Sequence, residues 1–360
     1  MWMQGLILAL SLALLAAGAD ALVRGASRLA VRLGISSLVI GLTVVAYGTS
    51  APEMLVSVLA AIRGNPDIAV ANVVGSNLFN TLLILGLCAT ISPLVVTPQL
   101  LRRDVPIMIA ATVLLICISL DGRISRLEGL LLACGAGAYS LLCIRAGRRR
   151  EGPGKDAESG RLRRGAGWLL GSGLVAAGLA LMVLGARWLV GSAVEIARAV
   201  GVSDLIIGLT VVAAGTSLPE VATSVVATIR GQRDIAIGNV IGSNISNILA
   251  ILGLSAAVVP GGLRIGPQLL QFDLPVLLGV SLICLPFMIT GRLFARWEGA
   301  LFLGYYLLYS AYVVRYATGH ARLGLIADLT ASVVLPLTML TLLIEVVRAV
   351  AARRKAGRPV

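Results

Sequence analysis

The chain has 360 residues, of which 58% are hydrophobic and 13% are charged, and its net charge is +13. This composition excludes a water-soluble globule, which would need a polar surface, and indicates a polytopic helical membrane protein. The positive charge does not indicate a nucleic-acid partner, because Lys and Arg cluster between the apolar segments, as the positive-inside rule predicts.

Apolar segments of about 20 residues, the length that crosses roughly 30 Å of hydrocarbon, recur along the chain. The first of them lacks a basic leader and is expected to be a retained span. We expect ten core transmembrane spans at 3–23, 35–62, 67–91, 104–120, 127–144, 167–190, 202–229, 234–258, 272–290 and 297–316. A last apolar stretch, 328–349, is predicted as an extra C-terminal transmembrane helix, with an interfacial helix as the alternative because Pro336 interrupts it.

The ten spans fall into two copies of one unit. A shift of 167 residues aligns Leu38–Leu87 with Leu205–Leu254 without a gap, and about two thirds of the positions are identical. GLTVVAYGTSAPE pairs with GLTVVAAGTSLPE, and GNPDIAVANVVGSNLFN pairs with GQRDIAIGNVIGSNISN. Five spans per copy is an odd number, so the copies must cross the membrane in opposite senses. The predicted fold is therefore an all-α polytopic membrane protein with two inverted five-helix repeats, as in secondary transporters.

This organisation predicts four regions and an orientation. Residues 1–145 form the first repeat unit, 146–165 a basic linker, 166–316 the second unit, and 317–360 the extra span with a basic tail. A cytoplasmic linker places most Lys and Arg inside. We expect a multi-pass protein of the cell membrane with its N-terminus outside and its linker and C-terminal tail in the cytoplasm.

Two acidic residues differ from the others in their position. Most acids lie in loops or at the starts of spans, where they favour the helix dipole and cap free N–H groups. Only Glu53 and Glu220 are predicted to lie deep in spans, and they are equivalent in the two copies. A charge at the bilayer centre costs about 2.5–3.5 kcal/mol on insertion scales. A bound cation or a proton must therefore neutralise these carboxylates.

A structural role is the alternative for this motif. Ser50, Pro52 and Glu53 fit a capping box at the start of a helix. A capping box would serve equally well near the membrane surface, however, and this one lies near the centre of a span in both copies. Gly48 and Pro52 also predict a broken helix, which would free backbone carbonyls around Ala46 as oxygen ligands.

Helical spacing predicts further oxygen ligands on the same face. Thr49, Glu53 and Ser57 are spaced i, i+4 and i+8 in the second span. The third span and the second copy carry equivalent rows: Asn72, Ser76, Asn77 and Asn80, then Thr216, Ser217, Glu220, Ser224, Asn239, Ser243, Asn244 and Asn247. For Asn72, Asn77, Asn239 and Asn244 the alternative is hydrogen bonding between helices. A set of oxygens without His or Cys favours hard cations such as Ca²⁺ and Na⁺.

The paired motifs, GTSAPE with GSNLFN and GTSLPE with GSNISN, resemble the alpha-repeats of the sodium/calcium exchanger (cation/Ca²⁺ antiporter) superfamily, in particular its prokaryotic calcium/sodium antiporter branch. The resemblance covers roughly residues 1–316. It implies ion sites between the second and third helices of each unit, and a first and a sixth helix that slide to alternate access. As ligands it implies the side chains of Thr49, Ser50, Glu53, Ser76, Asn80, Thr216, Ser217, Glu220 and Ser243, with the carbonyls of Ala46 and Ala213. Asn247 completes the set at a position where some members carry Asp, which weakens the case for potassium co-transport.

The expected function is secondary antiport of Ca²⁺ against Na⁺ by alternating access. Two carboxylates match one Ca²⁺, or two or more Na⁺, so the two ions compete for one site. Exchange of a cation for H⁺ through the same glutamates is the alternative. Ca²⁺, Na⁺ and the lipid bilayer are the expected partners, without a cofactor, a nucleic acid or a predictable protein partner. An intramembrane enzyme is not expected, because the single His, His320, lies in a loop and no Asp is predicted to lie deep in a span.

Overall fold

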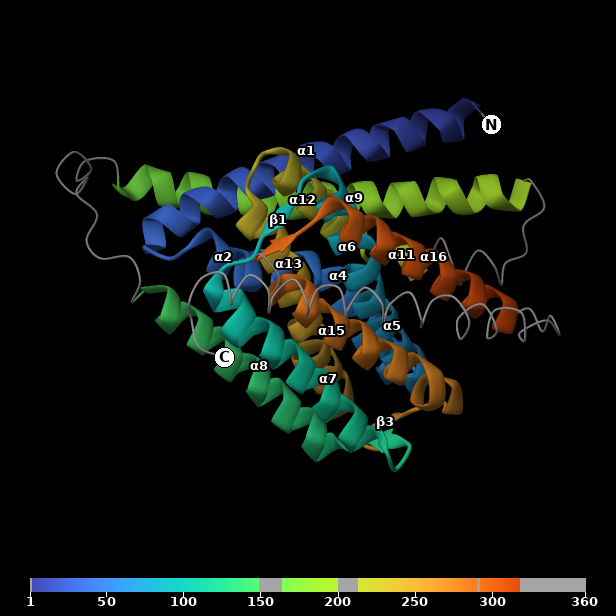
Figure 1. Ribbon diagram of the computed structural model, residues 1–360. Helices are drawn as coiled ribbons and strands as arrows, with labels where there is room; N and C mark the ends of the chain where they lie inside the picture. Colours follow the sequence, from blue (N-terminus) through green and yellow to red (C-terminus); the bar gives the residue numbers. More distant parts are fainter. Residues whose placement is uncertain (1, 149–163, 200–212, 290–291, 318–360) are drawn as a thin grey trace.

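The computed structural model describes residues 2–148, 164–199, 213–289 and 292–317, which form helices joined by short turns (Figure 1). In the first copy the α-helices are α1 (Trp2–Leu33), α2 (Ser37–Ile40), α3 (Ala46–Thr49), α4 (Ala51–Ile62), α5 (Pro66–Leu78), α6 (Leu85–Ile91), α7 (Val105–Ser119) and α8 (Arg126–Arg148). In the second copy they are α9 (Arg164–Ala199), α11 (Ala213–Gly215), α12 (Leu218–Ile229), α13 (Arg233–Ser246), α14 (Gly253–Val258), α15 (Leu274–Ile289) and α16 (Arg296–Ala317). Most of the predicted linker, the predicted extra C-terminal span and the basic tail lie outside the described residues.

Several of these helices are joined end to end by π-helical segments. These are η1 (Gly41–Val45), η2 (Phe79–Ile84), η3 (Leu100–Asp104), η6 (Asn247–Leu252) and η7 (Leu269–Asp273). Three of them adjoin the repeated motifs, since η1 precedes the GTS sequence and η2 and η6 contain the last Asn of the GSN motifs. Such π-helical turns often occur at functional sites.

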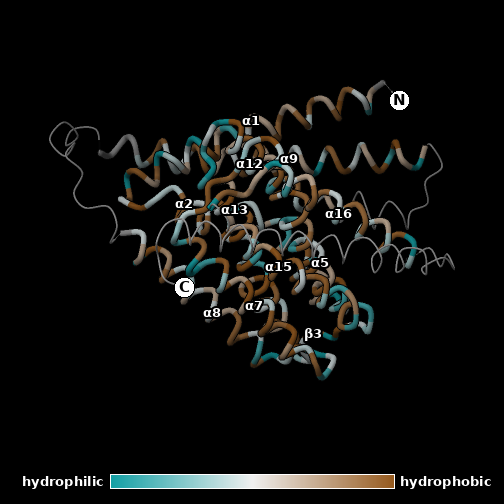
Figure 2. The backbone as a smooth tube through the Cα atoms, viewed as in Figure 1, coloured by the Kyte–Doolittle hydropathy of each residue, from teal (hydrophilic) through white to brown (hydrophobic). Residues whose placement is uncertain are grey.

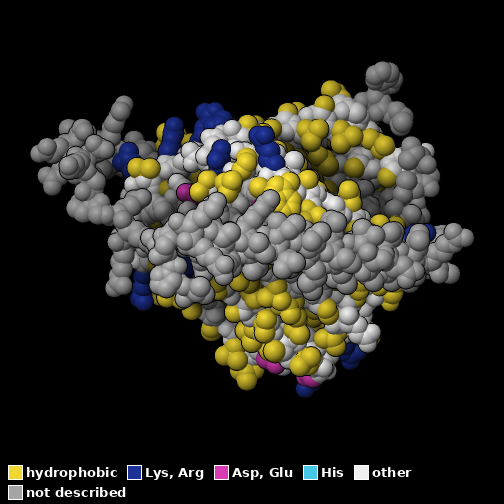
Figure 3. All heavy atoms as spheres, in the orientation of Figure 1, with side chains coloured by type: hydrophobic (Ala, Val, Ile, Leu, Met, Phe, Trp, Pro, Cys, Tyr) yellow, Lys and Arg dark blue, Asp and Glu magenta, His cyan; other side chains and the backbone are white. Residues whose placement is uncertain are grey.

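The outer surface of the helical bundle is apolar. Six described helices are long and apolar enough to cross a membrane, and there are up to seven such spans if the bent pair Ser37–Thr49 and Ala51–Ile62 counts as one. Helices also form at the predicted spans 104–120 and 297–316, which that test does not count. Hydrophobic side chains cover much of the visible described surface (Figure 3), and hydrophilic residues lie mostly at turns and helix ends (Figure 2). Exposed Leu131, Leu169 and Leu307 are typical of a surface that faces lipid.

The third span of each copy lies in the core. Arg233–Val258, which comprises α13, η6 and α14, is buried along the whole of its most apolar window, and Pro66–Ile91 is mostly buried. Glycines allow the central helices to approach closely, because a Cβ on Gly242 would lie 2.6 Å from the carbonyl oxygen of Leu42. The two copies therefore meet through the helices that carry the GSN motifs.

Helices α1 and α9 lie side by side and antiparallel across the bundle (Figure 1). A Cβ on Gly178 would lie 2.6 Å from the carbonyl oxygen of Gly18, and one on Gly185 would lie 3.0 Å from that of Ser11. The shift of 167 residues relates Gly18 to Gly185 and Ser11 to Gly178, so the two contacts are equivalent under exchange of the copies. Small residues thus set the distance between these two helices.

Two short antiparallel β-bridges interlock the copies. Strand β1 (Leu94–Val95) pairs with β4 (Leu293–Phe294), and β2 (Arg123–Ile124) pairs with β3 (Leu263–Arg264). In the aligned copies β1 corresponds to β3 and β2 to β4. The register agrees, since Leu94 faces Phe294 and the equivalent Leu263 faces Ile124. The two bridges lie in different parts of the bundle (Figure 1), which supports a two-fold relation between the copies.

The turn after the broken second span is built alike in both copies. Gly64 and Gly231 have φ of 83° and 74°, a region that favours glycine. The next residue closes the helix end in each case: the N–H of Asn65 donates to the Ala60 carbonyl, and that of Gln232 donates to the Ala227 carbonyl. This cap fixes the direction in which the third span enters the core.

We predict that Gly178→Val separates α1 from α9. The added side chain would meet the Gly18 carbonyl and the Leu22 backbone, and such overpacking lowers the free energy of unfolding by about 1–3 kcal/mol. Thermal unfolding in detergent measures the effect. Gly173→Val on the same helix is the matched control, since a Cβ at that position would have no atom within 4 Å. Equal melting temperatures for the two variants would contradict the packing argument.

Candidate cation site

The predicted helix break is confirmed. Helix α3 ends at Thr49, the following Ser50 has φ and ψ of −79° and 6°, and α4 lies at an angle of 47° to the segment before the break. Pro52 lies in the first turn of α4, where it has no N–H to donate to the carbonyl of Gly48. The second copy breaks in the same way at Ser217, before Pro219 at the start of α12.

The two breaks exchange hydrogen bonds across the copies. The hydroxyl of Ser50 donates to Glu220 Oε1 at 2.8 Å, and the hydroxyl of Ser217 donates to Glu53 Oε1 at 2.9 Å. Both carboxylates are 1% exposed. The capping box does not form, because neither serine makes a side-chain bond to its helix start. The serine hydroxyls instead bind the opposite glutamates at the junction of the copies.

Other predicted ligands contact this serine–glutamate arrangement. The hydroxyl of Ser76 on α5 lies 3.3 Å from that of Ser217. Thr49 Oγ1 lies 3.1 Å from Asn239 Oδ1 on α13 and also close to the Val45 carbonyl. Both copies and both the second and third spans therefore contribute to one polar centre.

Six predicted ligand atoms have no hydrogen-bond partner. Of the ten buried side-chain atoms that lack a partner in the described part of the chain, these six are Glu53 Oε2, Asn80 Oδ1, Thr216 Oγ1, Glu220 Oε2, Ser243 Oγ and Asn247 Oδ1. Buried polar atoms without partners are rare in native proteins because their desolvation is not compensated. A small cation bound by oxygen ligands would satisfy such atoms, and the set contains the donor types that Ca²⁺ takes.

The electrostatics of the site also require a positive partner. Glu53 accepts the hydroxyl of Ser217, three residues before Glu220, so the two buried carboxylates meet at one junction and repel each other when both are charged. Arginines do form ion pairs with other carboxylates, among them those of Asp20, Asp104 and Asp121. Removing two carboxylates from water without a counter-charge is costly, so a cation or protons must accompany them.

Burial within the protein is not limited to the two acids that were expected to lie deep in the membrane. Asp104 is fully buried within η3 and Asp273 nearly so within η7. These aspartates have protein donors, however. Arg103 Nε lies 2.8 Å from Asp104 Oδ1, and the hydroxyl of Tyr309 lies 2.9 Å from Asp273 Oδ1. The two glutamates differ because each keeps one oxygen without any donor.

Two acids at other span starts, Glu128 and Glu298, cap their helices as predicted. The N–H of Ser125 donates to Glu128 Oε2 at 2.7 Å, and the N–H of Ala295 donates to Glu298 Oε2 at 2.6 Å. These helix starts show the capping that Glu53 and Glu220 do not provide.

Among the carbonyls around Ala46 that the break was expected to free, that of Ala46 itself has a protein donor. The Ala46 carbonyl accepts the N–H of Ser50 at 3.0 Å and lies 3.3 Å from Thr49 Oγ1. In the second copy the N–H of Ser217 donates to the carbonyl of Ala214 at 3.2 Å. Pro52 has no N–H to donate to the carbonyl of Gly48. The helical hydrogen bond that the break removes therefore belongs to Gly48, about half a turn after Ala46.

The four asparagines with an alternative role do connect helices. Asn72 donates to Ser57 Oγ at 2.9 Å, and the equivalent Asn239 donates to Ser224 Oγ at 3.0 Å. Ser57 and Ser224 are thus held by asparagines and do not belong to the unpartnered set. These bonds join α4 to α5 and α12 to α13, which positions the glutamates against the third spans.

A second network of hydrogen bonds joins the third spans of the two copies. Asn77 donates to the Asn244 carbonyl at 3.1 Å, Asn244 donates to Thr81 Oγ1 at 2.6 Å, and Asn247 donates to Asn77 Oδ1 at 3.0 Å. Thr81 was missed by the sequence reasoning because Ile248 replaces it in the second copy. Its spacing of four residues from Asn77 was the available signal. The bond to Asn77 holds the amide nitrogen of Asn247 and leaves its Oδ1 without a partner.

Comparison with known proteins identifies the family. The family described as sodium/calcium exchanger protein matches residues 3–145 and 170–315. The chain belongs to the sodium/calcium exchanger family. It is therefore a multi-pass membrane transporter for cation exchange, and not an enzyme.

Individual members of this family are similar over most of their length. The chain is 39% identical to the inner membrane protein YrbG of Escherichia coli K12 over 77% of this chain and 86% of that protein. It is 35% identical to the sodium/calcium exchanger MaX1 of Methanosarcina acetivorans, over 84% and 96% of the two chains. A structure of the sodium-calcium exchanger NCX_Mj soaked with 10 mM Na⁺ and without Ca²⁺ aligns with a TM-score of 0.76 at 32% identity, over 86% of this chain and 99% of that one.

We predict that Ser50→Ala destabilises this exchanger in the absence of divalent cations. The change leaves both oxygens of Glu220 without a donor, and an unsatisfied buried group costs about 1–3 kcal/mol. Thermal unfolding in a chelating buffer measures it. Ser27→Ala is the control, because that hydroxyl bonds only to the Val23 carbonyl of its own helix. A Ser50 variant as stable as the control would show that the cross-copy bond contributes nothing.

Proposed function

We propose that this exchanger moves Ca²⁺ against Na⁺ through one site near the middle of the membrane, with access alternating between the two faces. One observation carries the proposal: Glu53 and Glu220 are buried together, each keeps one oxygen without a donor, and no described basic side chain pairs with them. The relative MaX1 is named as a sodium/calcium exchanger. Structures of NCX_Mj were obtained from crystals soaked with Na⁺ together with Ca²⁺ or Sr²⁺.

The proposed ligands divide by their role. Glu53 and Glu220 supply the charge, and the neutral oxygens complete the coordination of a cation that prefers six to eight oxygen ligands. The neutral set is Ser50, Thr49, Ser76, Asn80, Thr216, Ser217, Ser243 and Asn247, with the carbonyls of Ala46 and Ala213. The unpartnered atoms of Asn80, Thr216, Ser243 and Asn247 support their inclusion. Ser50 and Ser217 would hold the glutamates in place when the cation leaves.

The charge of the site provides the coupling. Two carboxylates are neutralised by one Ca²⁺ or by two Na⁺, and occupancy by either load excludes the other. While the site is empty, its two negative charges would have to pass through a low-dielectric region for access to change from one membrane face to the other. Access therefore changes only when bound ions neutralise the site. Each change of access therefore requires a bound ion, and the movement of Ca²⁺ in one direction is coupled to the movement of Na⁺ in the other.

The equivalence of the copies supports alternating access. Ten core spans in two inverted units, 1–145 and 166–316, would place the site at the centre, with the linker 146–165 and the tail of 317–360 in the cytoplasm and the N-terminus outside. The matched β-bridges and the reciprocal Ser–Glu bonds agree with such an inverted arrangement. The closely packed pair α1 and α9 is the element that we propose to slide against the rest.

We predict that proteoliposomes loaded with Na⁺ take up labelled Ca²⁺ when they are diluted into Na⁺-free buffer. The outward Na⁺ gradient supplies the driving force, so uptake should stop when Na⁺ is equal on both sides. Uptake driven by a pH gradient without any Na⁺ would instead identify H⁺ as the exchanged ion. Absence of uptake under both gradients would refute the proposal of cation exchange for Ca²⁺.

Glu53→Gln and Glu220→Gln are each predicted to reduce this uptake at least a hundredfold. The amide keeps the shape of the side chain but removes half of the site's charge, so a divalent ion would carry an uncompensated charge in the buried centre. Glu195→Gln is the matched control, because Glu195 is an exposed residue of α9. Normal Ca²⁺ uptake by either site variant would exclude the two-carboxylate mechanism.

A further inference from the structure

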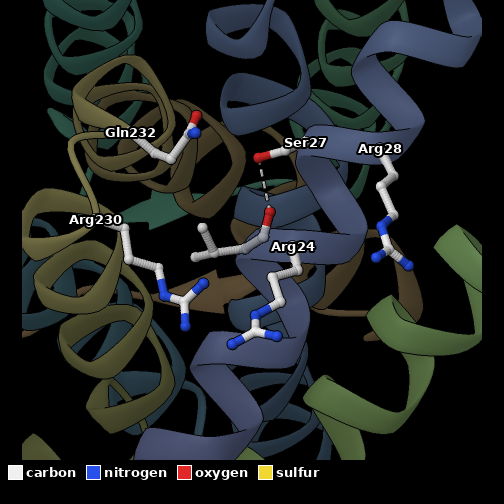
Figure 4. Close-up of a pocket in the computed structure, with 6 residues that line it drawn as sticks. Arg24, Ser27, Arg28, Arg230 and Gln232 are labelled. Atoms are coloured by element: carbon white, nitrogen blue, oxygen red, sulfur yellow. Dashed lines mark hydrogen bonds between the residues drawn. The ribbon is translucent and has the colours of Figure 1, made fainter.

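A carboxylate of α1 connects this helix to the opposite copy at one end of the bundle. Asp20 contacts Arg24 one turn along its own helix at 2.9 Å, and its other oxygen contacts Arg230 in the turn between α12 and α13. Figure 4 shows Arg24 and Arg230 pointing toward one another across a cavity of about 370 Å³. Because Asp20 already contacts both of these arginines, the cavity is better explained as the surroundings of an ion-pair network than as a site for an anion.

The two ends of the bundle are packed differently. Helix α1 packs along α12 at this end, whereas the equivalent helices α9 and α4 do not pack against each other to any comparable extent in the described residues. Two copies of one unit are therefore arranged asymmetrically. In an exchanger that alternates its access, this asymmetry corresponds to one of the two access states.

At the other end of the bundle, the residues equivalent to Asp20 and Arg230 carry charges that repel each other. The shift of 167 residues places Arg187 at the position of Asp20 and Arg63 at the position of Arg230. The same register is confirmed for these helices by the equivalent contacts Gly18–Gly178 and Gly185–Ser11. Arg187 and Arg63 are both exposed, and neither forms an ion pair with a described carboxylate. Closing this end would bring two positive charges together.

We propose that Asp20 is a positioning residue that latches α1 to the α12–α13 turn, and that Arg187 and Arg63 oppose closure of the other end. Both charge pairs then favour the access state seen in this structure. The inference rests on the proposed alternating access, and it adds that the two states differ in free energy through charges remote from the ion site. The pairs lie at the ends of the bundle, so they change the populations of the states without touching the transported ions.

The size of the effect follows from the exposure of the pair. The side chains of Arg230 and Asp20 are 35% and 27% exposed, which is typical of a partly solvated ion pair. Such pairs change an equilibrium by about two- to fivefold, and salt weakens them. This bias is large enough to set which state predominates, and small enough that ion binding can overcome it.

Hydrogen–deuterium exchange of the purified full chain in detergent, measured in saturating Na⁺ so that the neutralised site can face either side, tests the latch directly. Asp20→Asn should make the amides of residues 20–28 and of the α12–α13 turn exchange about two- to fivefold faster, because this end opens more often. The amides of the α4–α5 turn around Gly64 should exchange more slowly, since the other end closes in turn. Arg187→Asp should shift both regions in the same directions, because it creates an attractive pair with Arg63.

The swapped pair Asp20→Arg with Arg230→Asp should restore the exchange pattern of the unmodified chain. Asp121→Asn is the matched control, because it breaks an exposed ion pair with Arg123 remote from both ends of α1 and α9. A uniform increase in all regions would indicate simple destabilisation and overturn the proposal, as would unchanged exchange in Asp20→Asn. Because the readout is not transport, a shift in a chain that moves no Ca²⁺ would retain the latch and reject the proposed function. Normal Ca²⁺ transport with no shift in exchange would reject the latch and retain the proposed function.

Discussion

Two carboxylates at the junction of two copies of one unit, with no basic side chain beside them among the described residues, are the constraint on which the rest of the structure depends. Glu53 and Glu220 cannot be buried together as a charged pair unless a positive species accompanies them. The protein supplies one hydroxyl donor to each, from Ser217 and Ser50, and leaves the other oxygen of each without a partner. The site therefore holds its shape but is incomplete until a cation or protons complete it.

The helices around the two glutamates shield the interrupted helix backbone from lipid. A helix interrupted at Ser50 or Ser217 would be unstable against lipid, since lipid offers no hydrogen bonds. Helices α5 and α13 cover the two breaks from the core side, with asparagines bonded to the serines one turn beyond the glutamates. Glycines in α13 allow this cover to come close. The same small residues that weaken an isolated helix thus make the buried site feasible.

Duplication explains the symmetry of the site, and divergence explains the asymmetry of the molecule. The cross-copy bonds at the centre are reciprocal because both copies keep the same residues there. At the ends of α1 and α9 the copies differ, with Asp20 in one and Arg187 in the other. An inverted pair with equal ends would have two access states of equal energy. Sequence differences remote from the ion site are sufficient to make one state more stable.

The sequence by itself determined the membrane class, the two copies, the helix break and the pair of glutamates, because these depend on hydropathy, local spacing and the chemistry of proline. It also indicated which oxygens are available, since hydroxyl and amide positions repeat at helical intervals. Only the tertiary structure decided that Ser50 binds the glutamate of the other copy and does not cap its own helix, that the Ala46 carbonyl has a donor, and that Asp104 is buried beside Arg103. These outcomes depend on which helices meet, and packing between distant segments is not contained in any local pattern.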